Sequence, residues 1–275
     1  MMKKMYFLFV TSLCSTLLTA QTKVGSGLVQ LNIGDKYQPA EVEFADGSVK
    51  QGFINGFLEN NFIEFGSSTS FDNFESQLNL DDKKFYFKTE ENGKAIVLQQ
   101  KDLQQVTVME NGGEKSFRLL NIKTVGKNKQ IVDLNRKVWL PLLEERDEFS
   151  LYGFNLFINN RFVNTYVYIS GDNINAYKPT DKTFPSTDTM KESYTIMLKH
   201  VFNQCEAVNP NIAEFMNVEK WKQEKKKLDV RLKELKKDKN IPEANKEDAI
   251  LRLNQEYFTE PYIAIISQYK LSCKI

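Results

Sequence analysis

The spacing of apolar residues changes once along this chain, and that change most constrains its fold. Residues 28–178 contain short runs rich in Val, Ile, Phe and Tyr, in which apolar and polar residues alternate as they do in strands. Turn-forming pairs such as Asp46-Gly47 separate the runs, and no helical period alternates with them, which favours antiparallel pairing. Beyond residue 190 the apolar residues recur at intervals of three and four, the period of a helix. The sequence therefore predicts an α+β protein, with an antiparallel β-rich N-terminal region followed by a C-terminal helical region.

The strand-like runs are short and are separated by Gly, Asn and Asp. They span residues 40–45, 48–58, 61–65, 83–88, 103–110, 116–125, 138–144, 149–158 and 162–170. Residues 179–190 are rich in Pro, Thr, Ser and Asp, which predicts a linker to the helical region 191–275. Aromatic residues of the last strands could line a carbohydrate or peptide groove, but their alternation is typical of packing between sheets. They are Phe149, Tyr152, Phe154, Phe157, Tyr166 and Tyr168.

The first twenty residues predict export. Lys3 and Lys4 precede an apolar stretch, residues 6–18, which is too short to span a bilayer as a helix, and Ala20 supplies a small residue before a cut at Gln21. This order is that of a secretory signal peptide; a buried N-terminal helix and a short anchor are the alternatives. We therefore expect a periplasmic or secreted protein whose mature chain has no transmembrane segment.

Cleavage at Gln21 would leave two cysteines, Cys205 and Cys273, each at the end of an apolar stripe with helical spacing. The stripes consist of Tyr194, Met197, Leu198, Val201 and Cys205, and of Tyr262, Ile265, Ile266, Tyr269 and Cys273. Two cysteines in an exported chain predict one disulfide between the first and the last helix of this region. Two buried free thiols are the alternative. Pro261 is placed where the first turn of a last helix accepts proline.

Residues 219–258 lie between these two stripes and predict a charged helical hairpin. Residues 219–240 hold ten Lys or Arg and five Asp or Glu, and Trp221, Leu228, Leu232 and Leu235 form a thin apolar seam. Interleaved charges are typical of a solvated helix. The alternatives are a surface for an unknown envelope or extracellular protein, or a homo-oligomer formed through the hairpin; we expect no nucleic-acid partner. The candidate surface consists of Lys220, Trp221, Lys225, Lys226, Leu228, Leu232, Lys233 and Leu235.

No coherent set of catalytic residues is found. One histidine, His200, and three cysteines in the whole chain give no metal-binding spacing, and no cofactor motif occurs, so we expect neither a metal nor a cofactor. An acidic cluster between two expected strands, residues 144–148, could serve a carboxylate-dependent hydrolase, although such clusters are usually solvated turns. Its acids are Glu144, Glu145, Asp147 and Glu148.

Four segments of the chain resemble a group of uncharacterised exported proteins of Bacteroidota. The segments are Lys137-Val-Trp-Leu-Pro-Leu-Leu143, Phe149-Ser-Leu-Tyr152, His200-Val-Phe-Asn-Gln-Cys205 and Tyr269-Lys-Leu-Ser-Cys273. The resemblance covers roughly residues 137–275 without the charged hairpin. It implies export and the disulfide, and it implies no activity. The leading hypothesis is a non-enzymatic periplasmic or secreted binding or envelope-associated module; the hydrolase and the oligomerising protein are the alternatives.

Overall fold

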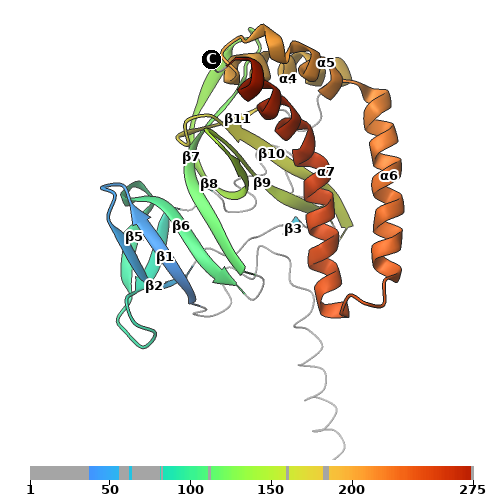
Figure 1. The fold of residues 1–275 in the computed structure, drawn as a ribbon. Coiled ribbons are helices and arrows are strands. Elements are labelled where there is room, and N and C mark those ends of the chain that lie inside the picture. The colour runs from blue at the N-terminus through green and yellow to red at the C-terminus, as the bar shows by residue number, and fades with distance from the viewer. Residues whose placement is uncertain are drawn as a thin grey trace, which may run out of the picture.

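A computed structural model describes residues 37–55, 62–63, 81, 83–110, 113–158, 161–181 and 186–273. The predicted signal peptide, residues 1–20, lies outside the described residues, as does most of the expected strand 61–65. Strands occupy the N-terminal part of the described chain and helices the C-terminal part (Figure 1), which confirms the α+β class. Within the described residues, no helix combines the length and the apolar composition that crossing a bilayer requires.

Five strands form a curled sheet at the N-terminal end of the molecule (Figure 1). They are β1 (Gln38–Phe44), β2 (Val49–Asn55), β4 (Lys84–Lys88), β5 (Ile96–Gln99) and β6 (Leu103–Glu110), which follows the short helix η2 (Gln100–Asp102). The turn between β1 and β2 is built by Asp46 and Gly47: the Asp46 side chain accepts from the Ser48 amide, and Gly47 has φ +81°. A residue without a Cβ adopts that conformation at no steric cost.

The remaining strands form a second unit in which the pairings close a ring. They are β7 (Gly113–Val125), β8 (Ile131–Arg146), β9 (Phe149–Ile158), β10 (Arg161–Ser170) and β11 (Asn175–Lys178). Consecutive strands pair antiparallel, and β11 also pairs with β7 in parallel, which completes the ring. A second parallel pair joins β9 to β3 (Phe62–Ile63). The ring encloses a core that includes Leu120, Leu140, Tyr152 and Phe154. Because β7 also pairs with β6, one continuous sheet links both units.

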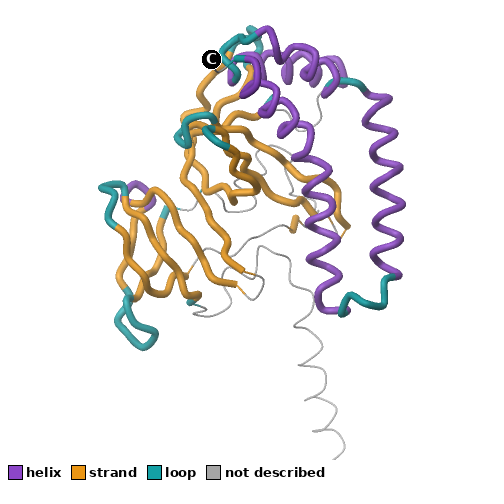
Figure 2. The backbone as a smooth tube through the Cα atoms, in the orientation of Figure 1, coloured by secondary structure: helices purple, strands orange, loops and turns teal. Residues whose placement is uncertain are grey.

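The helices cover the outer surface of the strand ring, with contacts to β7, β8, β9, β10 and β11 (Figures 1 and 2). They are α4 (Thr187–Val201), η3 (Glu206–Val208), α5 (Asn209–Phe215), α6 (Val218–Lys237) and α7 (Glu243–Ser272). Their apolar faces form one cluster with the outward side chains of the strands, among them Leu151, Val167 and Ile169. This sheet-on-helix layer is the part of the fold that shapes the site described below.

Several features differ from the sequence prediction, among them the start of β8 at Ile131 instead of residue 138. Helix α4 begins at Thr187, inside the segment predicted as a linker, because Ser186 caps it by accepting from the Thr189 amide. Pro261 lies in the middle of α7 rather than in a first turn. An interior proline removes one backbone hydrogen bond, and buried contacts on both sides of it, at Leu253 and Ile265, keep the helix continuous. The strands β5 and β11, each of four residues, were not expected.

Candidate functional site

The structure pairs Cys205 with Cys273 in a disulfide, with Cα atoms 6.2 Å apart, which confirms the predicted pairing. The positions of the cysteines differ from the prediction. Cys205 follows α4 in a turn, because α4 ends at Val201 and Asn203 and Gln204 take left-handed conformations at φ 51° and 58°. Cys273 is the residue that ends α7. The bond therefore joins the loop after α4 to the last turn of α7 and closes the helical layer.

The apolar seam of the predicted partner surface is occupied inside the chain. Leu228 is 3 % exposed, Leu232 and Leu235 are half-buried, and the helix that lies beside α6 is α7 (Figure 1). Trp221 is also half-buried, and the Tyr257 hydroxyl on α7 donates to its carbonyl at 3.2 Å. Leu228 is therefore buried inside the chain, whereas Trp221, Leu232 and Leu235 remain partly exposed.

The charged part of the predicted surface is exposed and largely self-compensated. Lys220 forms an ion pair with Glu214 at 2.6 Å, and Lys225 forms one with Asp229 at 3.1 Å. No ion pair forms at Lys226 or Lys233 with the residues that the structure describes. Exposed pairs of this kind each contribute about 0.2–1 kcal/mol at most. The arrangement is that of a solvated helix with local charge pairing.

The four acids of the cluster at residues 144–148 are held apart by different partners. Glu144 forms an ion pair with Arg146 at 2.8 Å, Glu145 accepts from the Ser150 hydroxyl at 3.4 Å, and Asp147 pairs with Lys270 of α7 at 2.8 Å. Asp147 has φ 54° in the turn between β8 and β9. Of the four, only Glu148 lines a described hollow. The sequence predicts this cluster between two strands, but Glu144 and Glu145 lie within β8, and only Asp147 and Glu148 lie in the turn. Glycoside hydrolysis needs two carboxyl groups on opposite sides of one bond, and the contacts of these four acids do not bring two of them together in this way.

The single histidine lies at the rim of that same hollow. His200 is exposed, and its ring packs on Tyr177 with centroids 5.4 Å apart. Glu148 and Asp172 line the hollow with it. No group of three metal-ligating side chains occurs in the described part of the chain.

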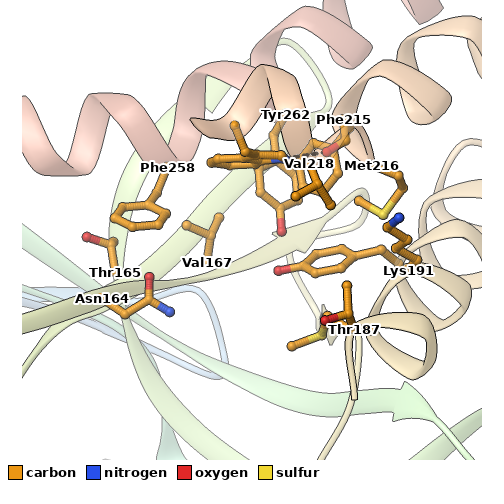
Figure 3. A pocket seen from close by; sticks show the side chains of 13 residues that line it. Asn164, Thr165, Val167, Thr187, Lys191, Phe215, Met216, Val218, Phe258 and Tyr262 are labelled. Carbon is orange, nitrogen blue, oxygen red and sulfur yellow. Dashed lines mark hydrogen bonds between the residues drawn. The ribbon is translucent and has the colours of Figure 1, made fainter. Parts of the chain in front are cut away.

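A cleft that the sequence did not predict lies between β10 and the helical layer (Figure 3). Its volume of about 480 Å³ is within the usual range for small-molecule sites, about 300–1,000 Å³. Five elements contribute to it, so its residues are far apart in sequence. The lining consists of Asn164, Thr165 and Val167 of β10, Thr187, Met190, Lys191 and Tyr194 of α4, Phe215 and Met216 at the end of α5, Val218 and Trp221 of α6, and Phe258 and Tyr262 of α7.

The walls of the cleft are mainly aromatic and are fixed by mutual contact. The Phe215 ring meets Trp221 edge-on at 5.7 Å and Tyr262 at 5.0 Å, and Phe258 lies 6.4 Å from Trp221. The Trp221 indole N–H donates to the carbonyl of Phe215, which fixes the orientation of the ring. Aromatic pairs in such edge-to-face contacts gain about 0.5–1.5 kcal/mol beyond their buried area. The walls are therefore formed before any ligand arrives.

One buried hydroxyl in this cleft makes no well-formed hydrogen bond to the residues described. It belongs to Tyr262, whose side chain descends from α7 into the middle of the cleft (Figure 3) and is 2 % exposed. Burial raises the pKa of Tyr262 well above its ordinary value near 10, and a hydrogen-bonding interaction with the neighbouring Tyr194 phenol adds to the rise. Burial also raises the pKa of Tyr194. Both phenols are therefore neutral and able to donate at physiological pH.

The other polar groups of the cleft lie toward its two ends (Figure 3). Lys191 and Thr187 lie at one end, in the first turns of α4, and Asn164 lies at the other. The hydroxyl of Thr165 is already used, since it donates to the Asn155 side chain at 2.7 Å. Among the lining residues that the structure describes, Lys191 alone carries a charge. The N-terminal end of a helix adds partial positive charge to the same side.

The signal for this site in the sequence is faint. Tyr194 and Tyr262 were recognised as members of apolar helix stripes, where a tyrosine needs a partner for its hydroxyl when it is buried. Nothing local indicates that the two stripes face each other across β10. Comparisons of the chain with protein-family models, with curated proteins and with solved structures found no match.

Proposed function

We propose that this protein is an exported, non-enzymatic binding module that holds a small amphipathic molecule in the cleft between β10 and the helices. The observation that carries this proposal is the Tyr262 hydroxyl, which is 2 % exposed and makes no well-formed hydrogen bond, with the Tyr194 phenol as a neighbour. A buried polar group without a partner destabilises a protein by about 1–3 kcal/mol. A ligand that supplies a partner recovers this energy, whereas a purely structural position could hold phenylalanine.

The composition of the cleft supports binding of an amphipathic molecule. Binding sites for small molecules are mostly apolar, with a few polar groups that fix the orientation of the ligand. Here Phe215, Trp221 and Phe258 supply the apolar walls, and Tyr262 and Lys191 supply the polar groups.

Within this proposal the charged helical hairpin of residues 219–258 has a structural role. It carries Trp221 on one helix and Phe258 on the other, and Leu228 holds the two helices together. The ion pairs on the outer side of the hairpin keep its exposed face hydrophilic. A partner protein is not required for that role.

Export is supported by the disulfide and by the order of residues at the N-terminus. A disulfide persists in an oxidising compartment and is rare in the cytosol. N-terminal sequencing of the protein isolated from its native host tests this part of the proposal. We expect a chain that begins at Gln21; recovery of the intact N-terminus from the cytosol would contradict export.

The binding proposal is tested with a neutral apolar probe, N-phenyl-1-naphthylamine, whose fluorescence rises in apolar sites. Because Trp221 lines the cleft whereas Trp139 lies in a separate core, the bound probe should accept energy mainly from Trp221. We expect saturable binding of one probe per chain, with the energy transfer lost in Trp221→Phe.

A matched pair of variants separates the cleft from the general surface. Thr187→Phe places a ring in the cleft, whereas Asp188→Phe places the same ring on the exposed side of the same helical turn. The first should weaken probe binding by about tenfold and the second should leave it unchanged. Equal binding to both variants, or no saturable binding to the parent protein, would overturn the proposal.

A further inference from the structure

The charge pattern of the cleft narrows the class of ligand. Lys191 is its only charged lining residue in the described part of the chain, and no carboxylate faces it there. Lys191 belongs to the second turn of α4, whose first turn, at Thr187, also lines the cleft. Asp188 and Glu192 of the same helix do not line it, and Glu192 is paired with Lys129 at 2.6 Å. The end of the cleft at α4 is therefore electropositive.

The Tyr262 hydroxyl lies between this positive end of the cleft and the apolar end at Phe258 (Figure 3). Tyr262 occupies the middle of the cleft, Lys191 and Met216 lie on one side of it, and Phe258 lies on the other (Figure 3). A neutral phenol donates a hydrogen bond, and hydrogen bonds to an ionised acceptor are shorter and stronger than bonds between neutral groups. For the head group of a ligand, the site thus offers the Tyr262 hydroxyl as a hydrogen-bond donor and the Lys191 ammonium as a cation. For the rest of the ligand it offers aromatic walls.

We propose that the ligand is a monocarboxylate with an apolar body, bound with its carboxylate between the Tyr262 hydroxyl and the Lys191 ammonium. The inference rests on the proposed function, since it concerns the same cleft. A single lysine balances one negative charge, which favours a carboxylate over a doubly charged phosphate. The body extends over Val167 toward Phe258, where no charged residue lines the cleft. Aliphatic and aromatic acids share this chemistry.

Isothermal titration calorimetry on the folded, oxidised protein tests the inference with three probes. Decanoate carries the carboxylate on an aliphatic body, 2-naphthoate carries it on an aromatic body, and decanol has the aliphatic body without the charge. We expect one site per chain for at least one of the two acids, and about tenfold weaker binding of decanol than of decanoate. The preferred acid identifies whether the body is aliphatic or aromatic.

Two substitutions test the head-group contacts, each with a control on the same helix. Lys191→Met should weaken binding of the acid by about threefold to fivefold and leave decanol unaffected; Lys199→Met, outside the cleft, should change neither. Tyr262→Phe should weaken binding of the acid by about tenfold, whereas Tyr269→Phe, two turns further along α7, should not. Folding of each variant is checked by circular dichroism.

The outcomes separate this inference from the proposed function. If decanol and decanoate bind equally well, or if Lys191→Met binds both acids as the parent protein does, the carboxylate assignment is wrong while the cleft remains a binding site. If none of the three probes binds and the neutral naphthylamine probe also fails to bind, the proposed function itself is wrong.

Discussion

The two apolar clusters that flank the closed strand ring are covered in different ways. In the curled N-terminal sheet, strand residues alone form the core: Phe85 meets Trp139 edge-on at 5.7 Å, and Val42, Ile54 and Phe87 are fully buried. On the outer face of β9 and β10 the core is completed by four helices. There the side chains of five elements meet, and they leave an aromatic cleft with a buried hydroxyl that makes no well-formed hydrogen bond to the residues described. The helical cluster thus combines a packed core with the cleft that the proposed function requires.

The largest expected effect comes from the disulfide, which belongs to the helical cluster only. Cys205 and Cys273 are 68 residues apart in sequence, and the chain-entropy model assigns a loop of this length about 4 kcal/mol. Replacing both cysteines with alanine should lower the free energy of unfolding by about this amount in urea titrations. The helical circular dichroism signal should be lost first, because the curled sheet has no crosslink. Coincident loss of helix and sheet signals at an unchanged midpoint would contradict this distinction.

The next effect concerns the contact between α6 and α7, for which the chain offers a matched pair. Leu228 is 3 % exposed, whereas Val230, two residues further on, is 54 % exposed. Leu228→Ala should cost about 2–5 kcal/mol, and Val230→Ala should stay within about 0.5 kcal/mol of the parent protein. Thermal unfolding measures both. Similar small losses for the two variants would mean that the apolar seam of α6 is not used inside the chain.

A smaller effect on the free energy of unfolding, which depends on pH, is expected at the Tyr262 hydroxyl. Because burial raises the pKa of Tyr262 in the folded state, ionisation of this phenol favours unfolding. Its contribution to the free energy of unfolding should be fully present below about pH 10 and should fall as the pH rises further. Tyr262→Phe should raise the free energy of unfolding at pH 7 by about 1–3 kcal/mol, because it removes a buried hydroxyl that makes no well-formed hydrogen bond, and it should move the alkaline unfolding midpoint to higher pH. An unchanged alkaline midpoint in this variant would contradict the described burial of the phenol.

The smallest effect is expected on the exposed side of α6. Lys225→Ala removes the ion pair with Asp229, and the loss should be about 0.3–0.5 kcal/mol at low salt and less at high salt. Chemical denaturation at two salt concentrations measures it. A loss greater than that caused by Leu228→Ala would show that the charges, rather than the apolar seam, hold this helix in place.

Local patterns predicted most of the strands and the pairing of the cysteines. Alternation places β9 at residues 149–158, as observed, and the turn at Gly47 separates β1 from β2. The sequence does not predict β5 and β11, because four residues are too few to show a period and β11 is held by long-range pairing with β7. The sequence predicts a helix start at Pro261, and this prediction is wrong because Pro261 lies inside α7. Tertiary contacts, which a local pattern does not show, allow the proline there.

Almost none of the candidate site could be predicted from the sequence. Its walls come from residues as distant as Asn164 and Tyr262, and their meeting depends on how the helices cross β10. The seam at Leu228 was correctly recognised as apolar, but only the structure shows that α7 covers it. Periodicity identifies which face of a helix is buried, and it does not identify what that face is buried against.

A crystal structure of the protein with decanoate or 2-naphthoate, whichever binds more tightly, would show the proposed head-group contacts themselves. We expect density for one acid per chain in the cleft, with a carboxylate oxygen about 2.6–3.0 Å from the Tyr262 hydroxyl and the apolar body directed toward Phe258. A cleft that stays closed to the acid, with the Tyr262 hydroxyl bonded to a protein group instead, would contradict the proposed contacts.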